Sequence, residues 1–229
     1  WKNGATSGKT VAGWAGMIYK EWYIFSNNFF IIIIASGLAG RYSFGNLYGI
    51  DWNPRFSMLY VGDTYNHRIL GYGPSAINGT LIFGGNGPGI NKTQLNTPRG
   101  LFFDSYSNSV IIANTQVNNV VQYVLDAQEW ILLAGSSNGS SGSTSMLFND
   151  PTQVRLDPMG NMYICDLGNH RIQLFYAGQT NGSTIAGITS VGGNNATTLN
   201  SPFSVSLDNQ LNLYVADSNK HRIQKFLRY

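Results

Sequence analysis

The chain repeats one phrase four times at a nearly constant spacing, and this period constrains its fold more than any other feature. Each copy is an apolar run followed by a polar turn, and the four copies are Leu59–Ile69, Val110–Val120, Met162–Ile172 and Leu213–Ile223. The residue after the apolar run is Asp63, Asn114, Asp166 or Asp217, so the steps are 51, 52 and 51 residues. A fixed period of this length indicates one supersecondary unit that buries its face against its neighbours.

Each repeat contains signals for four short strands. A turn precedes the first apolar strand, and in three repeats it holds a proline (Pro98, Pro151 or Pro202), whereas Leu47 takes that place in the first repeat. The phrase itself supplies the second strand, and two further strands follow, the last of which ends in small residues. Short β-branched and aromatic runs bounded by Gly, Asn, Asp and Pro are typical of strands. Four strands in a repeat of this length predict the blade of a β-propeller.

The phrase resembles the NHL repeat, whose pattern is Pro-x-x-(apolar)-Asp, then Tyr-Val-x-Asp-x-x-Asn-His-Arg-Ile and a Gly-rich connection. The resemblance covers four repeats, from Phe44 to the C-terminus, and is strong in the first, third and fourth. The fourth has Lys220 where the motif has Asn, and the second has amides or Val in place of Asp, His, Arg and Ile: Asn114, Asn118, Asn119 and Val120. The resemblance implies an all-β propeller of about four four-stranded blades.

We expect a single domain over residues 1–229, with blades at about 44–85, 98–135, 151–187 and 202–229. The last repeat stops after its third strand, whereas residues 1–13 resemble Tyr176–Gly187, the tail of the third repeat. Residues 1–13 are therefore predicted to complete the last blade through the strand Thr10–Ala12, which would cover an open sheet edge. The alternative is that the four repeats are a fragment of a larger ring.

One segment, residues 17–40, interrupts the period and includes the apolar run Phe29–Ala35. A membrane span needs about 20 mostly apolar residues, so this run predicts no span. An added strand or hairpin on the rim, a disordered loop and a translated intron are the alternatives.

Composition limits the partners. The net charge is +3 and no Lys/Arg run occurs, whereas a nucleic-acid groove usually combines clustered basic residues with aromatics. Cys165 is the only cysteine, so no internal disulfide forms, and it is expected to be a small buried residue. Five N-x-S/T sequons favour an extracellular protein only weakly, because this composition produces about that many by chance: Asn78, Asn91, Asn138, Asn181 and Asn195.

The motif residues are predicted to be structural. The histidines occupy one equivalent position in three blades and cannot easily converge on a metal, so each is expected to support its blade beside an arginine: His67, His170 and His221, with Arg68, Arg171 and Arg222. Asp63, Asp166 and Asp217 are expected to accept backbone N–H groups at the turns. Four further carboxylates either cap turns, the interpretation we favour, or ring a channel mouth and bind Ca²⁺: Asp51, Asp104, Asp157 and Asp208.

The predicted binding residues begin the innermost strands, where they would encircle one channel mouth: Tyr48, Arg99, Thr152 and Phe203, with Tyr65 at a turn tip. Aromatic and Arg side chains are the usual anchors of interfaces. We therefore expect a monomeric, non-enzymatic binding scaffold for a protein or glycan partner, with no catalytic residues, metal or cofactor. The resemblance leaves two alternatives: a metal-dependent lyase or hydrolase of the propeller type, and an RNA-binding NHL domain.

Overall fold

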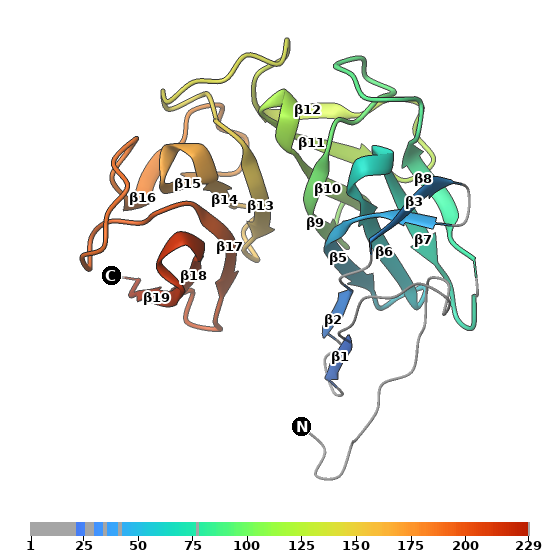
Figure 1. The fold of residues 1–229 in the computed structure, drawn as a ribbon, viewed down its shortest axis with the longest axis horizontal. Helices are drawn as coiled ribbons and strands as arrows, with labels where there is room; N and C mark the ends of the chain where they lie inside the picture. The colour runs from blue at the N-terminus through green and yellow to red at the C-terminus, as the bar shows by residue number, and fades with distance from the viewer. Residues whose placement is uncertain (1–21, 26–29, 34–35, 41–42, 77, 229) are drawn as a thin grey trace.

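The computed structural model describes residues 22–25, 30–33, 36–40, 43–76 and 78–228, and it describes side chains in 46–76 and 78–228. Within these ranges the chain forms strands and short 3-10 turns. Each repeat folds into one antiparallel sheet, and we call these sheets blades 1 to 4 in chain order (Figure 1). The prediction of an all-β propeller built from four repeats is confirmed.

The strands of each blade run outward from the innermost strand in sequence order. Blade 1 consists of β5 (Leu47–Asn53), β6 (Met58–Asp63), β7 (Arg68–Tyr72) and β8 (Thr80–Gly84). Blade 2 consists of β9 (Pro98–Asp104), β10 (Ser109–Asn114), β11 (Asn119–Val124) and β12 (Ile131–Gly135). Blade 3 consists of β13 (Pro151–Leu156), β14 (Met162–Asp166), β15 (Arg171–Phe175) and β16 (Ser183–Gly187). Blade 4 consists of β17 (Pro202–Leu207), β18 (Leu213–Asp217) and β19 (Arg222–Phe226).

Consecutive blades are held together by hydrophobic side chains from the facing sheets. Ile69 of blade 1 packs with Ile112 of blade 2, Val120 of blade 2 packs in one cluster with Ile164 of blade 3, and a similar cluster joins blades 3 and 4. Cys165 belongs to this last cluster and is fully buried. The neighbouring innermost strands β5, β9, β13 and β17 also contact one another in turn. The apolar faces of the repeats therefore form the core, as the period predicts.

Blade 4 has three strands among the described residues, and β19 is the edge of its sheet. Its Ile223 is 67% exposed, whereas the equivalent Ile69, Val120 and Ile172 are each fully buried. The predicted fourth strand, Thr10–Ala12, lies outside the described residues, so the completion of this blade by residues 1–13 stays a prediction.

The insertion contributes further strands. β1 (Trp22–Phe25) pairs antiparallel with β2 (Phe30–Ile33), and β3 (Ser36–Gly40) pairs with β4 (Ser43–Gly45). β2 contacts β5, and β4 contacts the first 3-10 turn, η1 (Thr64–Asn66). Of the alternatives for this segment, the described part contains an added hairpin. No helix in the described ranges is long and apolar enough to cross a membrane.

Candidate binding site

In blades 3 and 4 the motif carboxylate ties the turn of the blade to the connection that enters it. In blade 3, Asp166 Oδ1 accepts the backbone N–H of Asn149 at 2.7 Å. Its Oδ2 accepts Arg171 Nε and Asn169 Nδ2, each at 2.8 Å. Burial raises the pKa of Asp166, and these donors lower it in part by stabilising the charged form. Asp166 is therefore a buried, paired carboxylate with its lone pairs in use.

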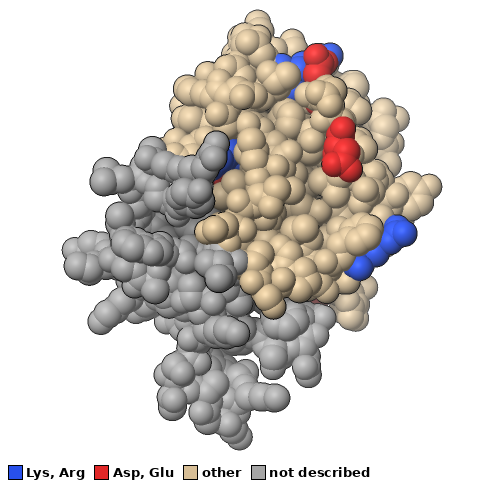
Figure 2. Space-filling model, turned by 90° about the vertical axis from the view of Figure 1, so that its right-hand side faces the viewer, with Lys and Arg blue, Asp and Glu red and all other residues tan. Residues whose placement is uncertain are grey.

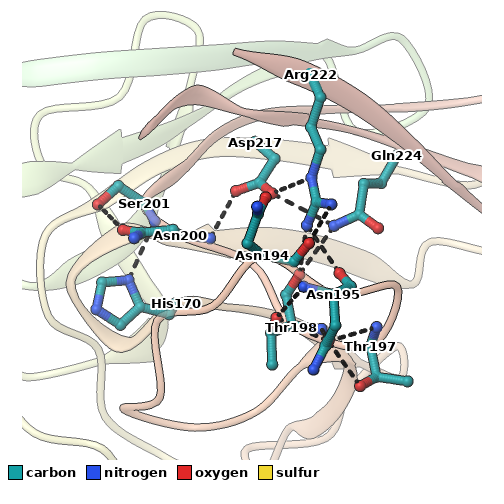
Figure 3. Close-up of polar contacts among 10 residues, drawn as sticks. All are labelled: His170, Asn194, Asn195, Thr197, Thr198, Asn200, Ser201, Asp217, Arg222 and Gln224. Atoms are coloured by element: carbon teal, nitrogen blue, oxygen red, sulfur yellow. Dashed lines mark hydrogen bonds and ion pairs between the residues drawn. The ribbon is translucent and has the colours of Figure 1, made fainter. Parts of the chain in front are cut away.

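Blade 4 repeats this arrangement (Figure 3). Asp217 Oδ1 accepts the backbone N–H of Asn200 at 2.6 Å, and Asp217 Oδ2 accepts Arg222 Nε at 2.8 Å. The Nη groups of Arg222 donate to the carbonyls of Asn194, Asn195 and Thr198 at 2.9–3.0 Å. The pair thus holds the connection between blades 3 and 4 in place.

The motif histidines of blades 1 and 3 join these blades to the blades that follow them. His67, His170 and His221 all have left-handed backbone, with φ of 53°, 56° and 51°. His67 Nδ1 accepts the N–H of Thr97 at 3.0 Å, and His170 Nδ1 accepts the N–H of Ser201 at 3.1 Å (Figure 3). Thr97 and Ser201 directly precede the innermost strand of the following blade, so these bonds fix where that strand begins.

Blade 2 keeps this geometry with neutral amides. Asn114 Oδ1 accepts the N–H of Asn96 at 2.7 Å, as Asp166 and Asp217 do in their blades. Asn118 Oδ1 accepts the N–H of Asp150 at 3.0 Å, in the place of the histidine. Asn119 Nδ2 donates to the carbonyl of Ser136 at 2.9 Å, in the place of the arginine. The sequence shows that the three positions change together, and the structure adds that the amides keep equivalent hydrogen bonds.

Acid should weaken the hydrogen bond that His67 Nδ1 accepts from the N–H of Thr97. Burial lowers the pKa of His67 below its value of about 6.5 in the unfolded chain. The charge of Asp63 opposes this shift without cancelling it. The unfolded state therefore binds more protons than the folded state in acid. The free energy of unfolding should fall as the pH drops below about 6.5, and one proton changes it by at most about 1.4 kcal/mol per pH unit. His67→Asn, which copies blade 2, should lose this share of the pH dependence. Urea unfolding at pH 7.5 and 5.5 tests this, and an identical loss of stability on acidification in both proteins would contradict it.

The structure brings together four of the five predicted binding residues. The ring of Tyr48 lies 5.7 Å from that of Phe203, and the guanidinium of Arg99 lies 5.5 Å from the Tyr48 ring. Thr152 is buried, and its hydroxyl donates to the carbonyl of Phe203 at 2.9 Å. We call Tyr48, Arg99, Thr152 and Phe203 the mouth cluster. Tyr65 is half-exposed on η1, and no ring contact joins it to this cluster in the described part of the chain.

Two glycines allow the innermost strands to approach this closely. A Cβ on Gly49 would overlap the carbonyl oxygen of Arg99, and a Cβ on Gly100 would lie 2.6 Å from the carbonyl oxygen of Thr152. Each glycine directly follows a mouth-cluster residue, Tyr48 or Arg99. The close backbone contact therefore places side chains from different blades beside one another on rigid strands.

Arg99 differs from the four arginines that form ion pairs in the blades. Its Nε is buried and has no hydrogen-bond partner, and within the described residues its guanidinium forms no ion pair. The arginines Arg68, Arg155, Arg171 and Arg222, in contrast, each pair with an aspartate. The mouth cluster thus combines an uncompensated cation with Tyr48, which is 44% exposed, and Phe203, which is partly exposed.

The structure corrects the grouping of Asp51 with the turn carboxylates. The register pairs Asn53 with Met58 and Asp104 with Ser109, so Asn53 is the equivalent of Asp104. The four equivalent residues each accept the N–H two positions ahead at 2.9–3.0 Å: Asn53, Asp104, Asp157 and Asp208. These side chains cap turns, and a ring of four equivalent carboxylates is wrong. Among the described residues no group of three or more His, Cys, Asp and Glu could hold a metal ion.

Asp51 instead lies two residues before the turn-capping Asn53, and its side chain contacts residues of other blades. Its Oδ2 accepts the N–H of Phe103 at 2.8 Å and lies 3.4 Å from Arg155 Nη1. Burial raises the pKa of Asp51, and Arg155 opposes that shift. Arg155 also lies over the ring of Phe102, at 5.7 Å. This pair links blades 1 and 3 across the innermost strands.

Residues 148–175 and 199–226 match the family model of the NHL repeat. The chain contains NHL repeats. The matched segments span the phrases of blades 3 and 4, including the Asp–His–Arg sets described above. A curated relative, NHL repeat-containing protein 3 of Mus musculus, is 31% identical over 93 residues, which cover 40% of this chain and 26% of the relative. The chain thus spans about a quarter of the length of that NHL protein.

Solved structures show the same fold. An auxiliary nutrient binding protein from Bacteroides thetaiotaomicron has a TM-score of 0.62 and 18% identity, and the match covers 79% of this chain and 47% of the other. A gluconolactonase from Xanthomonas campestris has a TM-score of 0.59 and 15% identity, over 80% and 58% of the two chains. At these identities the likeness is one of fold. The structures that share this fold include both a binding protein and an enzyme.

Proposed function

We propose that this NHL propeller is a non-enzymatic scaffold that binds a protein partner through the mouth cluster. The observation that carries the proposal is the convergence of Tyr48, Arg99 and Phe203 from three blades. Aromatic and arginine side chains supply most hot spots of protein interfaces, and they do so best when rigid strands hold them. The hydroxyl of Thr152 donates to the backbone carbonyl of Phe203 and so holds the start of β17.

The alternative functions receive less support from the described residues. The motif carboxylates of blades 3 and 4 and the motif histidine of blade 3 are engaged with backbone N–H groups or arginines, and such residues are poor candidates for acid–base catalysis. RNA binding through the phosphate backbone usually takes several Lys and Arg together. The face in Figure 2 carries scattered basic residues and no continuous basic plane.

Selection from a displayed random-peptide library against the whole chain tests the proposal. Binding of the selected peptides should fall about tenfold or more in Tyr48→Ala and Phe203→Ala, because each removes a central aromatic anchor. Tyr106→Ala is the matched control, since Tyr106 is 98% exposed on the turn after β9 and at the other end of that strand. All variants should keep the melting temperature to within a few degrees.

Peptides that bind Tyr48→Ala and Phe203→Ala as tightly as the parent would contradict the proposal. A second outcome is that no peptide is selected, while the chain binds a glycan array and Tyr48→Ala abolishes that binding. This outcome would show that the partner at the mouth cluster is a glycan and not a protein.

A further inference from the structure

The state of Arg99 indicates the chemistry of the partner. A buried hydrogen-bond donor normally has a partner, and one without a partner costs about 1–3 kcal/mol. Arg99 has such a donor at Nε, and the described part of the chain offers it no carboxylate. Four other arginines, in contrast, are compensated by an aspartate of their own blade or of another blade: Arg68, Arg155, Arg171 and Arg222.

The surroundings of Arg99 favour a single carboxylate as the missing group. The guanidinium lies over the Tyr48 ring at 5.5 Å, and within the described residues no hydrogen bond engages its Nη groups, which, unlike the buried Nε, remain for a partner. Tyr48 covers the cation with apolar surface, and Phe203 extends that surface through its contact with Tyr48, which strengthens an ion pair by excluding water. One uncompensated cation matches one carboxylate, whereas a nucleic acid would present a row of phosphates.

We propose that Arg99 binds the carboxylate of an Asp or Glu side chain in the protein partner, with Tyr48 and Phe203 packing on the residues beside it. This inference rests on the proposed function. It adds that the mouth cluster is selective for an acidic residue and that Arg99, and no other mouth-cluster residue, supplies the selectivity.

Two peptide pools that differ at one position test the inference. Both pools are random at the flanking positions, and the central residue is Glu in one and Gln in the other. The whole chain should bind the Glu pool about tenfold more tightly than the Gln pool, since a hydrogen bond to a charged group contributes more than one to a neutral group. Arg99→Gln should abolish this preference, and Arg99→Lys should keep part of it. The preference should also decrease with added salt.

Arg99→Met, which keeps the apolar stem, separates charge from packing and should also lose the preference. If both pools bind equally well and Tyr48→Ala still weakens both, the selectivity for a carboxylate is wrong while the proposed protein-binding function stands. If neither pool binds and an oligouridine probe binds in an Arg99-dependent manner, both the inference and the proposed function are overturned.

Discussion

Asp166→Asn is expected to lower the free energy of unfolding by about 3–5 kcal/mol, because it removes one partner of a buried ion pair. The Asp166 side chain is fully buried and that of Arg171 is 3% exposed. The substitution therefore leaves the charge of Arg171 buried without its counter-charge. The carbonyls of Ser143, Thr144 and Leu147 already accept its Nη groups and do not neutralise that charge.

A double-mutant cycle checks this prediction, because blade 2 shows the compensated alternative. Asp166→Asn/Arg171→Asn copies Asn114 and Asn119, and it should cost less than the sum of the two single variants by about 1 kcal/mol or more. Lys92→Ala is the control, since the exposed pair Lys92–Glu129 should change stability by less than about 0.5 kcal/mol. Strict additivity in urea unfolding would show that Asp166 and Arg171 are not coupled.

Deletion of residues 1–13 is expected to turn a monomer into aggregates. The segment Thr10–Gly13 reads Thr-Val-Ala-Gly, and Thr184–Gly187, in the outer strand of blade 3, reads Thr-Ile-Ala-Gly. If the first segment completes blade 4, its loss exposes the edge of β19, and unpaired edges promote association. Size-exclusion chromatography with light scattering measures this. A truncated protein that stays monomeric and melts at the same temperature would contradict the strand exchange.

The register of this pairing can be tested in the full chain. Ala186 pairs with Ile172 in blade 3, so Ala12 should lie opposite Ile223. A chain with Ala12→Cys and Ile223→Cys should form a disulfide within one molecule, whereas Ala12→Cys with Lys225→Cys should form little. Cys165 is fully buried and should not compete. A disulfide between molecules instead would indicate exchange between two copies.

Much of the fold follows from the sequence because one local pattern recurs four times. The apolar run, the turn and the period predict the second and third strands of each blade and their burial. The residues after the apolar run in blades 2 to 4 also keep one contact, since Asn114, Asp166 and Asp217 all accept the N–H of the incoming connection. The pattern specifies an acceptor, and an amide meets that need as a carboxylate does.

Other features depend on contacts that a single sequence does not display. The sequence groups Asp51 with Asp104 because each follows an apolar residue of the innermost strand, but β5 and β9 share one register, and in it Asn53 is the equivalent of Asp104. The mouth positions could be predicted from the repeat alignment. The lack of a partner for Arg99 could not, because it depends on which carboxylates other blades bring near. The insertion has no counterpart in the other repeats, and so the repeat gives no register for its strands.

Hydrogen–deuterium exchange with a tight-binding peptide from the Glu pool tests the central claim most directly. Protection should appear at the starts of the innermost strands, residues 47–50, 98–101, 151–154 and 202–205, and should be lost in Tyr48→Ala. The turns that carry the Asp–His–Arg sets should exchange as in the free protein, because those residues already bind one another. Protection confined to those turns or to the outer strands, with none at the mouth cluster, would contradict the account.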